Sequence, residues 1–183
     1  MKHLLRDILV PIILAIAIFF LLHALVPSFI IISPSMVPSL QVGERLLINK
    51  VVYNFHEPER GDIITFYPQG NREAVPFIKR VIGLPGESIE IKQGIVYIHK
   101  ENGTVLPLDE PYIEEAPNHP FTGDTIPENE YFVLGDNRNN SSDSRNGWTV
   151  KRKDIIGKAW LSIWPWDKWG VVANPLQEQP LSP

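Results

Sequence analysis

The residues with the clearest potential for chemistry are two serines, Ser33 and Ser35, in the stretch IIISPSMVPSL at residues 30–40. A serine hydroxyl becomes a nucleophile only where a neighbouring base removes its proton. The setting is unusual for a linker, because an apolar approach leads into a turn stiffened by proline. The stretch alone leaves two interpretations open: a serine-rich turn that follows a helix, or a nucleophile held in a rigid turn.

A candidate base is Lys79, in the stretch PFIKRVIGLPG. Alternation along a strand places Lys79 and Arg80 on opposite faces, so that one of these two cations can point inward. Burial disfavours the ammonium form, and lowering the pKa of a lysine from about 10.4 to about 8 requires roughly 3 kcal/mol. Taken alone, the stretch favours the alternative, a solvent-facing lysine that protects an edge strand from aggregation.

A third segment, LGDNRNNSSDSRNGW at residues 134–148, is polar and follows an expected strand. It contains four charged residues of alternating sign at close spacing: Asp136, Arg138, Asp143 and Arg145. Such a segment can lock itself through carboxylate–guanidinium pairs and side-chain-to-backbone hydrogen bonds. A loop made rigid in this way is suited to positioning catalytic groups, and a solvated, mobile loop is the alternative.

The elements that must position these residues begin with an apolar N-terminal segment. No charged side chain occurs from residue 8 to residue 43, and the first part of this stretch is long enough to cross a bilayer as a helix of about 20 residues. We therefore expect a cytoplasmic N-terminus over residues 1–7 and a transmembrane anchor over residues 8–27. Lys2 and Arg6 precede the span, so the positive-inside rule places the remainder outside the cytoplasm. A cleaved signal peptide fits less well, because its apolar core is shorter, about 7–15 residues.

The rest of the chain is expected to be mainly β, with a sandwich- or barrel-like catalytic domain over residues 28–170. Short stretches rich in β-branched and aromatic residues are separated by turn signals. The expected strands lie at residues 45–53, 62–67, 77–83, 88–100 (a hairpin), 130–136 and 155–164. Residues 101–128 are expected to form a loop or small insertion, and residues 171–183 a disordered tail.

The composition excludes several classes of function. A formal net charge of -4 gives no general attraction to nucleic acid. The absence of cysteine removes disulfides, thiolate metal sites and cysteine nucleophiles. The five histidines are scattered and form no H-E-x-x-H pair, so we expect no metal and no cofactor. Tryptophans gather near the end of the chain, where we expect Trp160 in the core and Trp166 or Trp169 at the surface, in contact with lipid.

The order of three segments, SPSMVPSL, FIKRVIGLPGE and GDNRNNSSDSR, resembles the successive boxes of the type I signal peptidases. These are membrane-anchored serine proteases that remove signal peptides from exported proteins. The resemblance runs from the anchor to about Trp166, and the stretches GERLLINKVVY and RGDIITFYP are also similar to that family. It implies a serine endopeptidase at the outer face of the inner or plasma membrane that cleaves preproteins after small residues in an A-x-A-like arrangement.

The resemblance also implies roles for individual residues. Ser35 is the implied nucleophile and Lys79 its general base, while Ser33 and the backbone N–H of Ser35 form the oxyanion hole. Ser141 is implied to hydrogen-bond Lys79, and Met36 to pack beneath the nucleophile. The remaining implied residues are the supporting charges Asp136, Arg138, Asp143 and Arg145 and a substrate pocket of Ile31, Ile32, Met36 and Ile78. Two positions depart from the family pattern, since Pro34 stands where glycine is usual and Asn139 where aspartate is frequent.

The implied partners are preprotein signal peptides and the lipid bilayer, with the protein export machinery as a further candidate. The substrate is expected to add as an extended strand beside the sheet edge near residues 77–83. Two other classes of protein stay open. One is an anchored β-domain without catalysis, and the other is a Ser/Lys self-cleaving regulator similar to the repressors of the SOS response, against which the anchor argues.

Overall fold

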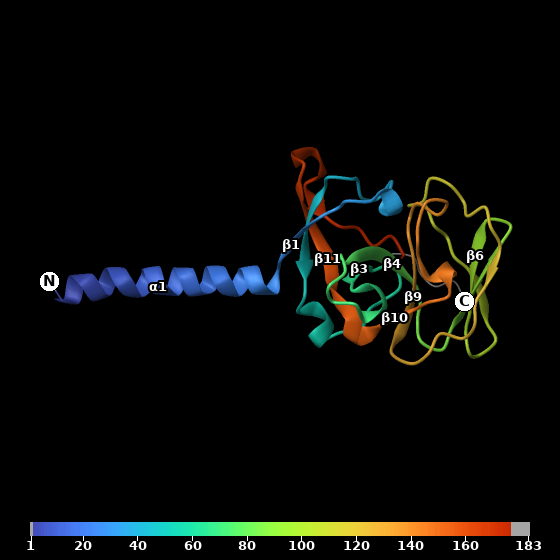
Figure 1. Cartoon of the computed structure of the whole chain (residues 1–183), viewed down its shortest axis with the longest axis horizontal. Coiled ribbons are helices and arrows are strands. Elements are labelled where there is room, and N and C mark those ends of the chain that lie inside the picture. Colours follow the sequence, from blue (N-terminus) through green and yellow to red (C-terminus); the bar gives the residue numbers. More distant parts are fainter. Residues whose placement is uncertain (1, 177–183) are drawn as a thin grey trace.

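The computed structural model describes residues 2–176, without the side chains of residues 2–5 and 21–23. The N-terminal apolar segment forms one helix, α1 (Lys2–Leu25), which extends away from a β-rich domain (Figure 1). Apolar side chains such as Ile13, Phe19 and Phe20 are exposed along it. Among the described residues, no helix meets the combined requirement of length and apolarity for crossing a membrane, and the anchor over residues 8–27 is therefore not confirmed.

The β-rich domain contains a large sheet of eight strands, as the mainly β prediction requires. The strands are β1 (Ser28–Ile30), β2 (Arg45–Asn49), β3 (Ile63–Phe66), β4 (Phe77–Gly83), β9 (Glu130–Leu134), β10 (Val150–Lys151), β11 (Ile155–Trp164) and β12 (Gly170–Val171). Their order is β1-β2-β11-β3-β4-β9-β10, with β12 paired to β11. Strand β4 thus lies between β3 and β9, so the stretch that contains Lys79 is central to the sheet.

A second sheet has four strands in the order β7-β6-β5-β8. It is built from β5 (Ser88–Lys92), β6 (Ile95–His99), β7 (Val105–Pro107) and β8 (Phe121–Thr122). The β5–β6 pair is the hairpin expected at residues 88–100. The predicted insertion at residues 101–128 is not all loop, because β7 and β8 form the two edges of this sheet. Three-residue and two-residue strands are too short to stand out by periodicity, and pairing with β6 and β5 defines them.

The core lies in three apolar clusters, and two of them support the residues of interest. One cluster surrounds Met36 and Leu40 and packs the Ser33–Ser35 stretch onto β2 and β11. Another includes Val81 and Val133 and joins β4 to β9. The third, around Ile82 and including side chains of β5 and β6, fastens the small sheet to the large one. Both stretches that carry candidate catalytic groups therefore rest on packed strands.

The tryptophans near the end of the chain lie at the surface. Trp166 and Trp169 stack on each other at 5.6 Å between ring centroids, and both are exposed. Trp160 is 47 % exposed, so the expectation that it lies in the core is wrong. It alternates along β11 with the buried Ala159, and period-2 alternation places neighbouring side chains on opposite faces. Of the tail predicted to be disordered, residues 177–183 lie outside the described residues, while Leu176 is buried.

Candidate active site

The Ser33–Ser35 stretch forms a short 3₁₀ turn, η1 (Pro34–Met36), directly after the β1 region. Ser33 caps this turn, and its Oγ accepts the N–H of Ser35 at 3.4 Å. Pro34 occupies the first position of the turn, where its missing N–H leaves no hydrogen bond unmade. Met36 is completely buried beneath the turn. The proline is therefore compatible with the local backbone and stiffens it.

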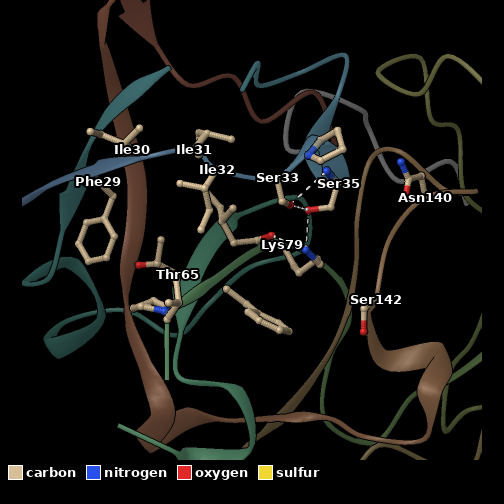
Figure 2. A pocket seen from close by; sticks show the side chains of 15 residues that line it. Phe29, Ile30, Ile31, Ile32, Ser33, Ser35, Thr65, Lys79, Asn140 and Ser142 are labelled. Carbon is tan, nitrogen blue, oxygen red and sulfur yellow. Dashed lines mark hydrogen bonds between the residues drawn. The ribbon is translucent and has the colours of Figure 1, made fainter. Parts of the chain in front are cut away.

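Ser35 and Lys79 meet although 44 residues separate them in sequence. Lys79 Nζ lies 2.7 Å from Ser35 Oγ and also donates to the carbonyl of Ile78 at 2.9 Å (Figure 2). The hydroxyl of Ser33 donates to Ser35 Oγ at 3.1 Å. Ser35 is 5 % exposed and Lys79 4 % exposed, so the contact is shielded from bulk water. This is the geometry that a nucleophile and its base require.

The environment of Lys79 stabilises the neutral amine relative to a lysine in water. Burial lowers the pKa of Lys79 to about 8, although the charges of Asp143 and Asp136 act in the opposite direction. Desolvation penalises the ammonium more than these carboxylates stabilise it. At pH 8 about half of the molecules therefore carry a neutral Lys79, which can accept a proton.

Lys79 is not the only buried cation on β4, because Arg80 is 1 % exposed. Alternation predicted that one of the two cations can point inward, and the structure buries both of them. Arg80 is compensated by Asp136, with contacts of 2.8 and 2.7 Å, and by the carbonyl of Gly61 at 2.8 Å. Its guanidinium also lies over the ring of Tyr112 at 4.1 Å.

The third polar segment is only partly self-locking. Asp143 and Arg145 form a two-point pair within it, with both contacts at 2.8 Å. Asp136 instead pairs with Arg80 of β4, and Arg138 pairs with Glu110 of the inserted segment. Because these partners are distant in sequence, alternating charge within the segment could not reveal them. The segment is nevertheless rigid, since Asp136, Arg138 and Asp143 are each 1 % exposed or less.

Ser141 lies in the third segment, close to Gly135. Its Oγ is buried and has no hydrogen-bond partner among the described residues, so the implied hydrogen bond to Lys79 is absent. The carbonyl of Ile78 takes the second contact of Nζ instead. A Cβ at Gly135 would lie 2.2 Å from Ser141 Oγ and 2.5 Å from the carbonyl oxygen of Ser35. Glycine at position 135 therefore allows the third segment to approach the η1 turn.

A cavity of about 450 Å³ opens beside the two groups. Ile31, Ile32 and Ile78 line it as expected, whereas Met36 packs beneath the turn and is not part of the lining. The other lining residues are Phe29, Ile30, Ser33, Pro34, Ser35, Thr65, Val75, Pro76, Phe77, Lys79, Asn140 and Ser142 (Figure 2).

Among these lining residues, Phe77 could have been found from sequence, since it shares a strand face with Lys79. Thr65 could not, because the β3–β4 register places it opposite Ile78. The cavity is mainly apolar and suits small aliphatic groups.

Comparisons with known proteins show the family of this chain. Residues 3–164 match the family model described as "Signal peptidase, peptidase S26". A signal peptidase I of Leptolyngbya laminosa is 42% identical over 149 residues, which cover 78% of this chain and 71% of the relative. A signal peptidase I of Bacillus amyloliquefaciens is 37% identical, with 84% and 82% covered. A crystal structure of a signal peptidase I from Enterococcus faecalis is 36% identical, covers 56% of this chain and 97% of its own, and gives a TM-score of 0.47.

Proposed function

The chain belongs to the type I signal peptidases of family S26, and from this premise we propose that it cleaves signal peptides from preproteins with Ser35 as nucleophile and Lys79 as general base. The observation that carries the proposal is the 2.7 Å contact between a buried Lys79 amine and the Ser35 hydroxyl at the end of an apolar cavity. A non-catalytic domain or a self-cleaving regulator is not favoured by relatives that are named signal peptidases.

In the proposed reaction, neutral Lys79 accepts the proton of Ser35 Oγ while Oγ bonds to the scissile carbonyl carbon. The oxyanion of the tetrahedral intermediate accepts hydrogen bonds from the N–H of Ser35 and from the hydroxyl of Ser33. For this the Ser33 hydroxyl turns away from Ser35 Oγ and releases the Ser35 N–H. The ammonium of Lys79 then gives its proton to the departing amine as the peptide bond breaks. Neutral Lys79 then accepts a proton from water as its oxygen attacks the remaining ester, and the Lys79 ammonium returns that proton to Ser35 Oγ as the ester C–O bond breaks.

Only part of strand β4 is free to pair with a substrate strand. Strand β9 pairs with β4 from Arg80 onward, and β3 pairs with β4 on its other side, so most of the expected edge at residues 77–83 is occupied. Within the described part of the chain, residues 77–79 pair with a strand on the β3 side only, and they border the cavity. We place the substrate there, between residues 77–79 and 29–33, with its small side chains in the cavity. Asp143, Arg145, Asp136 and Arg138 would hold the surrounding backbone.

We further propose that the catalytic domain works at a membrane surface, with the N-terminus cytoplasmic and the domain outside. Strands β1 and β11 lie on the side of the domain from which α1 extends (Figure 1). Exposed Trp164, Trp166 and Trp169 cluster at the end of β11, and tryptophan rings suit the interface between lipid and water. This placement would bring Ser35 to the depth at which a signal peptide leaves the bilayer.

The test is cleavage of a labelled preprotein by the full chain in detergent. A substrate with alanine at the first and third positions before the scissile bond should be cut at that bond, as mass spectrometry of the products would show. The same substrate with tryptophan at either position should be cut at least about tenfold more slowly, because a ring against the wall beside Ser35 would displace the scissile carbonyl from Ser35 Oγ. Equal cleavage of all substrates, or cleavage by the Ser35→Ala variant, would contradict the proposal.

A further inference from the structure

Asn137, a residue of the third segment, hydrogen-bonds the η1 turn (Pro34–Met36), which carries the proposed nucleophile and is called the nucleophile turn below. Its backbone N–H donates to the carbonyl of Ser35 at 3.0 Å. Its side-chain Nδ2 donates to the carbonyl of Pro34 at 3.2 Å. Asn137, 102 positions or more away in the chain, thus contacts two consecutive carbonyl groups of η1, and the Pro34 carbonyl also accepts the N–H of Val37 at 3.1 Å within the turn. Neither contact involves the hydroxyl of Ser35 or the amine of Lys79.

The Pro34 carbonyl belongs to the same peptide plane as the N–H of Ser35. Because a trans peptide is planar and places C=O and N–H on opposite sides, fixing one group fixes the direction of the other. A hydrogen bond to the carbonyl also polarises the unit and makes its N–H a stronger donor. The N–H of Ser35 is the backbone donor that the proposed mechanism directs at the oxyanion, so Asn137 acts on the orientation and strength of this donor.

Asn137 can act in this way because its neighbours are themselves fixed. Arg138 donates from Nε to the carbonyl of Gly135 at 3.0 Å, and its guanidinium pairs with Glu110. Asn139 donates from Nδ2 to Glu115 at 3.1 Å and accepts the N–H of Asn118 at 3.0 Å. Residues of the inserted segment (101–128) therefore hydrogen-bond both residues that follow Asn137, which are Arg138 and Asn139.

This arrangement also accounts for asparagine at position 139. An aspartate would lose the amide donor and place a second carboxylate against Glu115.

We propose that Asn137 is a positioning residue for the reaction, which holds the Pro34–Ser35 peptide so that the Ser35 N–H points at the developing oxyanion. The inference rests on the proposed function. It adds a role for a residue that, among the described residues, hydrogen-bonds neither the Ser35 hydroxyl nor the Lys79 amine. A donor that acts mainly on the transition state changes kcat and leaves substrate affinity unaltered.

The test replaces the side-chain donor and keeps the backbone one. In the full-length enzyme, Asn137→Ala should lower kcat for a preprotein substrate by about three- to tenfold with KM unchanged, since one hydrogen bond is lost. The midpoint of the pH profile should stay in place, because no charge changes. Asn137→Asp should lower kcat further than Asn137→Ala, since a carboxylate would face the Pro34 carbonyl. A matched control is Asn102→Ala, an exposed asparagine in the turn between β6 and β7, which should retain native kcat.

Thermal unfolding of each variant separates loss of fold from loss of positioning, and Asn137→Ser, which also lacks the amide donor, serves as a second measurement if Asn137→Ala is unfolded. Native kcat in folded Asn137→Ala or Asn137→Ser would overturn the inference. A rise in KM with native kcat would overturn it as well, because Asn137 would then bind substrate. Failure of the proposed function is distinct, since in that case Ser35→Ala would retain activity.

Discussion

Alanine in place of Lys79 is expected to lower kcat/KM for preprotein cleavage by about 10²–10⁴-fold, the range that a positioned general base contributes. Among the described residues, Ser35 Oγ has hydrogen bonds with Ser33 and Lys79 only, and the Ser33 hydroxyl is too weak a base to replace an amine. Lys79→Arg is expected to be equally inactive, because a guanidinium does not release its proton near neutral pH. The measurement is steady-state cleavage of one preprotein in detergent, at a pH where the native enzyme is fully active.

Lys92→Ala is a suitable control, since Lys92 is an exposed lysine on β5, away from the cavity. It should retain native activity. The double variant Ser35→Ala/Lys79→Ala should be no less active than either single variant, because residues that act as a unit have non-additive effects. If Lys79→Ala is folded and keeps more than about a tenth of native kcat/KM, Lys79 is not the base.

The second large effect is expected at Gly135, which lies where the third segment touches the nucleophile turn. A Cβ there would lie 2.5 Å from the carbonyl oxygen of Ser35 and 2.2 Å from Ser141 Oγ. The contact with Ser35 involves backbone, so Gly135→Ala must displace the turn that carries the nucleophile. A misplacement of about 1 Å can cost on the order of 100-fold in rate, and we expect a fall in kcat of that size. Overpacking should also destabilise the fold by about 1–3 kcal/mol.

Gly170→Ala is the matched control, because a Cβ at Gly170 meets nothing within 4 Å. Adding Ser141→Gly to Gly135→Ala removes one of the two close contacts and leaves the backbone contact, so activity should not return to the native level. Cleavage assays and thermal unfolding on the same preparations give both quantities. Native activity in Gly135→Ala would show that the turn tolerates displacement, and would contradict a rigid nucleophile turn.

Local patterns in the sequence predicted the elements that carry the site. Period-2 alternation and turn signals predicted two of these strands, β4, which contains Lys79, and β9, which follows the inserted segment. The predicted boundaries lie within a few residues of the observed ones. The proline between Ser33 and Ser35 indicated a rigid turn, and the structure shows η1 there. Such features depend on neighbours in sequence, which is why they can be read without a structure.

Features that depend on distant partners could not be predicted in this way. Burial of both Lys79 and Arg80 follows from the central position of β4, which is a matter of strand order. The pairing of Arg138 with Glu110 requires the inserted segment to fold back onto the third segment. The resemblance implied a hydrogen bond between Ser141 and Lys79, whereas the buried Ser141 Oγ makes none among the described residues and the Lys79 amine donates to the carbonyl of Ile78. The pairs Arg80–Asp136 and Arg138–Glu110 join residues that only the tertiary fold brings together.

The central claim, that neutral Lys79 activates Ser35, is tested most directly by the pH dependence of kcat/KM for preprotein cleavage. Burial lowers the pKa of Lys79 to about 8, and the base form is the deprotonated one. Activity should therefore rise about tenfold per pH unit below this value and level off above it, with a midpoint near pH 8 in the free enzyme. A profile that is flat from about pH 6 to about pH 10, or that falls through this range, would contradict a lysine base.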